Sequence, residues 1–283
     1  MKHEESKFTG YGDLQLYYQT WRPDDAPKAT LIVVHGLGEH GGRYMNLVNA
    51  IVPDGVTVYA FDHRGHGRSA EKMVAHVDSW DEYRGDVAAF VKMVAKNEAD
   101  TPLFLMGHSM GGLIVTNYVL HHPDGLRGSD KLRGVIISAP PLGEVDVSPV
   151  LRGIGKVMSA IKPDFAIDSG LDVNGISRDP AVVAAYENDP LVHGKVSARW
   201  STEFFKTIDW TRDHAADFKS PVLMIHGEAD SLVPIAGSRA FFEQIQQEDK
   251  TYIAYEGGYH ESLNDLHHAQ AAADIGGWIE ARI

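Results

Sequence analysis

Short apolar runs rich in branched side chains recur along the chain and are separated by longer amphipathic stretches. Their length and composition are typical of buried β-strands. They cover residues 13–20, 30–35, 56–62, 102–107, 134–139, 221–227 and 250–256. Between several of them, apolar residues recur at helical spacing. We expect one helix from Ser79, where Ser79 and Glu82 are spaced as a capping box, and others over 110–121, 235–245 and 264–283.

This alternation predicts an α/β fold with a mostly parallel central sheet, helices on both faces, and one or two antiparallel strands at the start. The alternation stops between Pro140 and about Lys219, where helical runs at 148–162 and 195–208 replace the strands. We therefore expect a core made of 1–140 and 220–283, and a helical cap, or lid, made of 141–219. Because ligands bind outside the carboxyl ends of parallel strands, the cap should roof the binding site.

Composition narrows the classes of function. The 283 residues include no cysteine, which excludes disulfides, thiol catalysis and cysteine-based metal centres. A net charge of −13 disfavours a nucleic-acid partner, whose phosphates would be repelled. The start, MKHEESKFTGYGD, lacks the apolar region of a signal peptide, and no apolar run reaches the length of a membrane span, so we expect a cytoplasmic protein. No histidine pair has a recognisable metal-binding spacing, so we expect no metal and no other cofactor.

A candidate nucleophile stands between the strand at 102–107 and the helix after it. Residues 107–111 read GHSMG, which is the G-x-S-x-G pattern of a nucleophile elbow. In such an elbow the serine occupies a strained turn, and only small residues fit beside it. The strand, turn and helix context predicts that Ser109 is a catalytic nucleophile.

A serine hydroxyl needs a base, and the base needs an acid that orients it. Asp230 follows the strand at 221–227, and His260 follows the strand at 250–256, in the chain order expected for such hydrolases. Glu228 is the competing acid in the same loop, but it lies nearer the strand and has less reach. We therefore predict the set Ser109, Asp230 and His260.

The remaining histidines have simpler interpretations. Two pairs are expected on helix surfaces, namely His121 with His122 and His267 with His268. His108 precedes Ser109 in an extended segment, so its side chain is expected to turn away from the serine.

The stretch HGLGEHGG at 35–42 has two interpretations. Its G-x-G-x-x-G spacing, with Asp62 after the next strand, matches a dinucleotide-binding loop. Alternatively, its glycines let the backbone approach a substrate and supply N–H donors to an oxyanion. We favour the second interpretation, because the first leaves the three predicted catalytic residues unexplained. The donors are then the backbone N–H groups of Leu37 and Met110.

Several motifs together carry a resemblance to a known family. They are HGLGEHGGRY, DHRGHGRS, GHSMGG, HGEADSLV and GGYHES, at 35–44, 62–69, 107–112, 226–233 and 257–262. The combination resembles the monoacylglycerol lipase and lysophospholipase group of α/β-hydrolases, from about residue 10 to the C-terminus. The resemblance implies an α/β-hydrolase fold, the same catalytic set and oxyanion donors, and a structural turn at DHRGHGRS.

The resemblance further implies a substrate class. We expect hydrolysis of a small lipid ester, in the first place a monoacylglycerol, with a lysophospholipid or a simple carboxylic ester as alternatives. The acyl chain would lie beneath the cap, and Glu39 and Arg43 are candidates for a glycerol pocket. An equally weighted interpretation makes these two a helix-start acid and a surface ion pair.

The helical run at 148–162 also has two interpretations. Its apolar stripe, which includes Val150 and Ile154, either lines the acyl channel and contacts lipid aggregates or a membrane surface, or packs on the domain below. The first interpretation makes the enzyme peripheral at membranes. The oligomeric state and the mobility of the cap cannot be read from these patterns.

Two other functions compete with a lipase. An aminopeptidase-like hydrolase would need acids in the cap to recognise a free amino terminus, and Glu144 with Asp146 is the only sign of them. A ligand-binding receptor with the same fold would have lost turnover, which the intact catalytic set disfavours.

Overall fold

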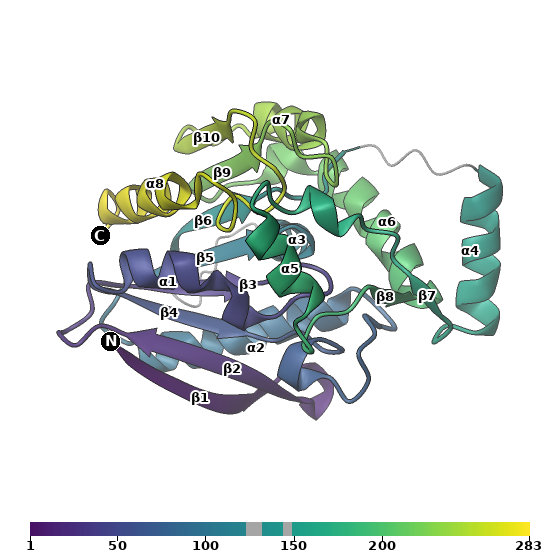
Figure 1. The fold of residues 1–283 in the computed structure, drawn as a ribbon, viewed down its shortest axis with the longest axis horizontal. Coiled ribbons are helices and arrows are strands. Elements are labelled where there is room, and N and C mark those ends of the chain that lie inside the picture. The colour runs from purple at the N-terminus through teal and green to yellow at the C-terminus, as the bar shows by residue number, and fades with distance from the viewer. Residues whose placement is uncertain (123–131, 144–148) are drawn as a thin grey trace.

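One eight-stranded sheet organises the chain (Figure 1). The computed structural model describes residues 1–122, 132–143 and 149–283, with the backbone alone at 149–152 and 154. The strand order is β1-β2-β4-β3-β5-β6-β9-β10. The strands are β1 (Lys2–Thr9), β2 (Gln15–Arg22), β3 (Ala29–Val34), β4 (Val56–Phe61), β5 (Leu103–His108), β6 (Leu132–Ser138), β9 (Val222–Gly227) and β10 (Lys250–Tyr255). Each predicted apolar run is a strand of this sheet.

The strand directions agree with the prediction. Strands β3, β4, β5, β6, β9 and β10 pair in parallel, whereas β2 pairs antiparallel with both β1 and β4. Strand β1 was not predicted from the sequence. It reads KHEESKFT, and Phe8 is its single buried residue, because it lies at the edge of the sheet and carries the charges that protect such an edge.

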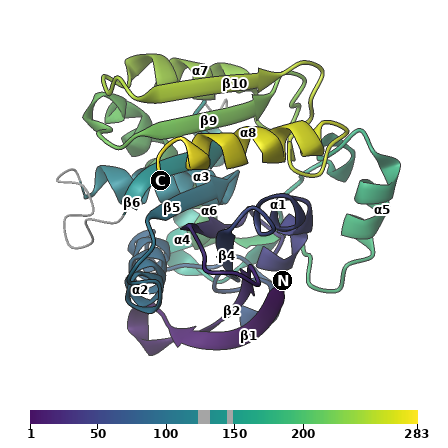
Figure 2. The ribbon, with the colours of Figure 1, turned by 90° about the vertical axis from the view of Figure 1, so that its left-hand side faces the viewer.

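Helices cover both faces of the sheet, as predicted (Figure 2). On one face lie α1 (Met45–Ile51) and α8 (His268–Glu280), and on the other lie α2 (Asp81–Asn97), α3 (Met110–Leu120) and α7 (Ile235–Gln244). The predicted capping box of α2 is wrong. Ser79 Oγ accepts from Asp81 N, and the Glu82 carboxylate is held by Arg64 and Asp78 N instead of Ser79 N, so the helix begins two residues later.

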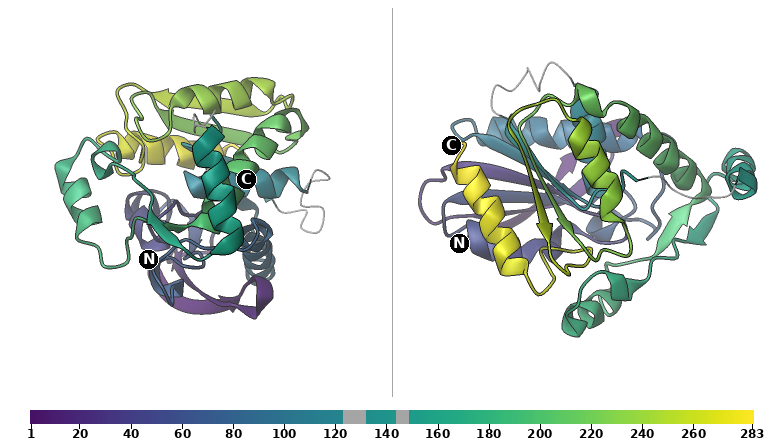
Figure 3. Two further views of the ribbon diagram at one scale, coloured as in Figure 1. Left: turned by 90° about the vertical axis from the view of Figure 1, so that its right-hand side faces the viewer. Right: turned by 90° about the horizontal axis from the view of Figure 1, so that it is seen from above.

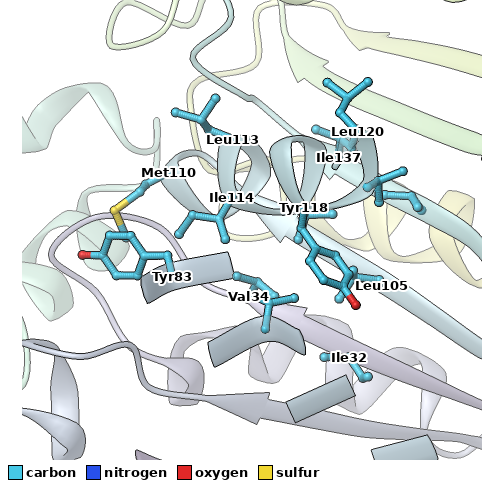
Figure 4. Close-up of a cluster of buried hydrophobic side chains, with 14 of the residues drawn as sticks. Ile32, Val34, Tyr83, Leu105, Met110, Leu113, Ile114, Tyr118, Leu120 and Ile137 are labelled. Atoms are coloured by element: carbon cyan, nitrogen blue, oxygen red, sulfur yellow. The ribbon is translucent and has the colours of Figure 1, made fainter. Parts of the chain in front are cut away.

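Helix α3 lies at the centre of one hydrophobic core. Every one of its residues is buried, and its apolar side chains pack on strand residues such as Ile32, Val34 and Leu105 (Figure 4). Burial of each large aliphatic side chain stabilises the fold by about 1.5–3 kcal/mol. The core therefore fixes the start of α3, which directly follows Ser109.

The segment between β6 and β9, which we call the insertion, departs from the alternation of long strands and helices (Figure 3). It contains α4 (Pro149–Ile161), β7 (Ala166–Asp168), α5 (Pro180–Glu187), β8 (Lys195–Ser197) and α6 (Ala198–Asp213). The antiparallel pair β7 and β8 was not predicted, because three residues per strand are too few to give a pattern. Its division from the core at 140 and 220 stays a prediction.

Close backbone packing at the start of α3 makes a prediction about stability. A Cβ atom on Gly111 would lie 2.1 Å from the Val34 carbonyl oxygen and 2.4 Å from that of His35. Neither oxygen can move without shifting the end of β3. We expect Gly111→Ala to lower the free energy of unfolding by about 2 kcal/mol or more, measured by urea denaturation.

The matched control is Gly277→Ala in α8, where the new Cβ would meet nothing within 4 Å. This change should raise stability by about 0.5–1 kcal/mol. Equal effects of the two substitutions would contradict the packing argument.

Candidate active site

Ser109 occupies a strained turn between β5 and α3. Its φ of 52° and ψ of −121° place a non-glycine residue in a region that L-amino acids rarely adopt. The turn is tight, because a Cβ on Gly107 would lie 2.3 Å from the Gly111 carbonyl oxygen. The backbone N–H of Ser109 donates to the Ser138 carbonyl oxygen at 2.8 Å. The backbone thus has the conformation expected of a nucleophile elbow.

Asp230 and His260 form a buried pair. His260 Nδ1 lies 2.6 Å from Asp230 Oδ2, and both residues are less than 8% exposed. The other carboxylate oxygen, Oδ1, accepts from the backbone N–H groups of Leu232 and Val233. Glu228, the competing acid, is exposed and pairs with Arg239 at 2.9 Å. The acid that contacts His260 is therefore Asp230.

The pair perturbs the titration of both groups. Burial by itself would raise the pKa of Asp230, but the charge of His260 and hydrogen bonds from both His226 and His260 lower it well below its usual range. Burial by itself would lower the pKa of His260, but the Asp230 carboxylate raises it above the ordinary 6.5. Asp230 is therefore ionised, and His260 binds its second proton more readily than a histidine in water.

Ser109 and His260 line one small cavity of about 50 Å³. Leu37 lines it as well, and the loop that carries it lies against the serine, since a Cβ on Gly36 would be 3.3 Å from Ser109 Cβ. Met110 is the first residue of α3, where backbone N–H groups have no partner within the helix. Leu37 thus belongs to the loop that packs against Ser109, and Met110 directly follows Ser109 at the start of α3.

The cavity is lined by both apolar and polar residues. Its apolar lining is Leu37, Leu171, Val173, Ile176, Leu232 and Val233, and its polar lining includes Glu39, Tyr186 and Glu261. The segment between β6 and β9 supplies Leu171, Val173 and Ile176 to this lining. An amphiphilic molecule suits such a lining.

Glu39 and Arg43 belong to a buried ionic cluster with Glu261. Arg43 donates to both carboxylate oxygens of Glu261, at 2.7 and 2.8 Å, and to Glu39 at 3.0 Å. The Tyr186 ring covers the guanidinium, whose carbon lies 4.5 Å from the ring centre. Burial raises the pKa of Glu39, whereas Arg43 lowers that of Glu261. A surface ion pair is therefore the wrong interpretation of Glu39 and Arg43.

The sequence interpretation missed Glu261 and Tyr186. Glu261 directly follows His260, and this position next to the base is a signal that could have found it. Tyr186 comes from α5, in an insertion whose sequence has no motif, and nothing short of the fold places it over Arg43.

Two predictions about histidines are wrong. His108 does not turn away from the site. It lines the cavity, and its ring centre lies 4.8 Å from that of His260, because the strained turn at Ser109 ends the alternation of an extended strand. Burial lowers the pKa of His108 to about 3, so it is neutral. His267 is not a helix-surface residue, since it precedes α8 and is half-buried against Tyr255.

The alternative nucleotide-binding interpretation fails on Asp62. Its carboxylate is 1% exposed and accepts from the backbone N–H groups of Gly41 and Arg68, at 2.9 and 2.8 Å. It therefore ties the glycine-rich loop to the DHRGHGRS turn and is not open to a ribose.

Residues 173–193 of the insertion connect the loops that carry the site. At one end, Glu261 N donates to Ile176 O at 2.8 Å. Glu261 lies next to His260 on the loop after β10, which we call the histidine loop. At the other end, His193 N donates to Gly38 O at 2.9 Å, and His40 Nε2 lies 3.0 Å from Asp189 Oδ2. This part of the insertion is therefore bonded to the histidine loop and to the glycine-rich loop together.

Two general features of the described residues bear on the site. Over residues 1–122, 132–143 and 149–283, no cluster of three His, Asp or Glu side chains is arranged to hold a metal ion. Within the same ranges, no helix has the length and apolar character needed to cross a membrane.

Comparison with known proteins decides the family. Residues 25–267 match the family described as serine aminopeptidase, S33 (Hydrolase_4). The chain belongs to this α/β-hydrolase family. A monoacylglycerol lipase of Mycolicibacterium smegmatis is 36% identical over 99% of the chain and 98% of that protein. Phospholipase YtpA of Bacillus subtilis is 33% identical over 87% of the chain and 92% of that protein.

A solved structure agrees with this membership of the Hydrolase_4 family. The monoacylglycerol lipase of Paleococcus ferrophilus superposes with a TM-score of 0.81 at 32% identity, covering 95% of this chain and 99% of that one. The resemblance inferred from the motifs and the predicted α/β-hydrolase fold are both confirmed. The relatives named as lipases act on small lipid esters, as their names state.

The contact between Asp230 and His260 predicts how the imidazole of this Hydrolase_4 protein titrates. Because the pKa of His260 is raised, its protonated form stabilises the fold below pH 6.5, and that contribution is lost as the pH rises through the raised value. NMR of ¹³C-labelled histidine should give a midpoint for His260 above 6.5. In Asp230→Asn, burial remains and the charge is gone, so the midpoint should fall below that of the wild type. An unchanged midpoint would contradict the assignment of the carboxylate as the cause.

Proposed function

We propose that the protein hydrolyses monoacylglycerols to glycerol and free fatty acid through an acyl-enzyme on Ser109. The observation that carries the proposal is that a strained serine and a histidine held by a buried aspartate meet at one cavity with apolar and polar lining. The lipase names of relatives that span nearly the whole chain support the substrate class.

The residues divide the chemistry as follows. His260 takes the proton of Ser109 Oγ as that oxygen attacks the ester carbonyl, and then gives it to the leaving glycerol oxygen. Asp230 orients the imidazole and stabilises its charged form. The N–H groups of Leu37 and Met110 donate to the oxygen that becomes negative in the tetrahedral intermediate. A water molecule activated by His260 then releases the fatty acid.

We propose that the polar and the apolar lining residues contact different parts of the substrate. The glycerol hydroxyls face Glu39 and Glu261, whose carboxylates can accept from them, while Arg43 holds both acids in place from behind. The acyl chain leaves along the apolar lining, under the residues of the insertion. The link of Glu39 and Arg43 to the head group stays a prediction, with Arg43 as support for the acids.

Three alternatives are weaker. A phospholipase relative keeps a lysophospholipid or a simple ester as the first alternative. The family description keeps an aminopeptidase as the second, but its candidate acids, Glu144 and Asp146, lie outside the described residues. A receptor without turnover would have no need of the contact between Asp230 and His260.

The substrate test is fatty-acid release from monolauroylglycerol, dilauroylglycerol and lauroyl-lysophosphatidylcholine, for the wild type and Ser109→Ala. We expect turnover mainly of the monoacylglycerol. Ser109→Ala should lower kcat by about a thousandfold or more, since the nucleophile is lost. Aminoacyl anilides and short synthetic esters serve as comparison substrates. Turnover of short esters alone would contradict the lipase assignment, and no turnover of any ester would favour the receptor.

An exposed apolar patch on the insertion supports contact with lipid. The patch consists of Val157, Ile161, Phe165, Ile167 and Leu171, which are 56%, 76%, 42%, 43% and 45% exposed. All five lie within residues 157–171, and exposed apolar surface that is contiguous is typical of sites that contact a membrane or a partner. We propose that it docks on lipid aggregates or membrane surfaces. The side chains of Val150 and Ile154, on which the stripe was first predicted, lie outside the described residues.

Charging this patch should separate binding from chemistry. We expect Ile161→Glu with Phe165→Glu to weaken sedimentation with phosphatidylglycerol vesicles by about tenfold or more, because two apolar side chains are replaced by charges that anionic lipid repels. Turnover of a short soluble ester should change less than twofold by the same reasoning. Ile283→Glu, which charges another exposed apolar residue at the C-terminus, is the control. Unchanged sedimentation with vesicles, or an equal loss of sedimentation and of soluble-ester turnover, would rule out the docking role.

A further inference from the structure

A second histidine contacts the same carboxylate oxygen as His260. His226, on β9, is fully buried, and its Nε2 lies 3.1 Å from Asp230 Oδ2 and 2.8 Å from the Val233 carbonyl oxygen. Its other ring nitrogen, Nδ1, lies 2.7 Å from Ser238 Oγ. None of these contacts involves substrate, since His226 does not line the cavity.

The partners of His226 fix where its proton lies. A carbonyl and an ionised carboxylate can only accept, so Nε2 must carry hydrogen and donate. Asp230 Oδ2 therefore accepts from two imidazoles, while Oδ1 accepts from two backbone N–H groups. All of the roughly four acceptor positions of the carboxylate are filled. His260 therefore shares the hydrogen-bond acceptor Oδ2 with His226.

We propose that His226 is a positioning residue that shares Asp230 Oδ2 with His260, so that it sets both the orientation of the carboxylate and the charge that His260 experiences. The inference deepens the proposed function and rests on it. The atoms that react belong to Ser109 and His260, and His226 acts on them only through Asp230.

His226 is itself held by elements away from the cavity. Ser238 Oγ, on α7, also contacts Tyr252 OH of β10 at 2.8 Å and the Ile235 carbonyl at 3.0 Å. These contacts fix the ring against rotation. The other titratable groups that act on His260 are Glu261, Glu39 and the neutral His108. None of them contacts His226, so a change at His226 reaches His260 through Asp230.

Two substitutions at position 226 separate the two ends of the ring. In His226→Gln the side-chain amide reaches the place of Nε2 and can donate to both Asp230 and Val233. In His226→Asn the shorter amide reaches only the place of Nδ1. It therefore keeps the contact with Ser238 and loses the contact with Asp230. Both variants are polar and similarly buried, so a loss of folding should affect both, and thermal denaturation checks this.

The expected results differ in pH dependence as well as in rate. His226→Asn should lower kcat for monolauroylglycerol by about ten- to a hundredfold, since a charge-assisted hydrogen bond is lost. With less competition for Oδ2, His260 should hold its proton more tightly, so the acid limb of kcat/KM should move to higher pH. His226→Gln should keep the wild-type acid limb and a larger share of kcat.

NMR titration of His260 in the same variants gives a readout that does not depend on turnover. An upward shift in His226→Asn that is missing in His226→Gln supports the proposal, even if the natural substrate is not a monoacylglycerol. If both variants keep the wild-type acid limb of kcat/KM and the wild-type NMR midpoint of His260 while stability and kcat fall, His226 has only a structural role. Equal shifts in both variants would also overturn the proposal. If wild type and Ser109→Ala are alike on every ester, the proposed function fails instead.

Discussion

The close approach of α3 to the ends of β3 and β5 is the constraint on which the site depends. Glycines at 107 and 111 let backbone meet backbone where a side chain would clash, and the serine between them takes up the strain. The cost of that strained residue is about 1–3 kcal/mol, and the buried surface of α3 offsets it. The buried, apolar helix α3 therefore allows Ser109 to be held in an unfavourable backbone conformation.

The other catalytic parts are held by contacts between distant segments. The histidine loop follows β10 and the glycine-rich loop follows β3, which are not adjacent in the sheet, but residues 173–193 are bonded to both loops. The ionic cluster of Glu39, Arg43 and Glu261 joins the same two loops by a second route. The loop of His260 and the loop of Leu37 are thus held relative to each other by the insertion as well as by the sheet.

The sequence predicted the features that short contiguous motifs encode. The strands of the sheet, apart from β1, could be predicted from buried branched runs, and the positions of Ser109, Asp230 and His260 from the strand ends that they follow. Strand β1 was missed because a solvated edge has no apolar pattern, and β7 and β8 because they are too short. Glu261, Tyr186 and His226 depend on partners far along the chain, and neither spacing nor composition shows such pairings.

The insertion consists of two parts with different attachments. Residues 173–193 are bonded to the catalytic loops, whereas α4 packs on α6, where Ser159 meets Thr202 at 2.8 Å. Substitutions in α4 therefore act on a helix that is attached separately from the residues that line the cavity. The outer surface of α4 can thus diverge without altering the contacts that hold the two loops together.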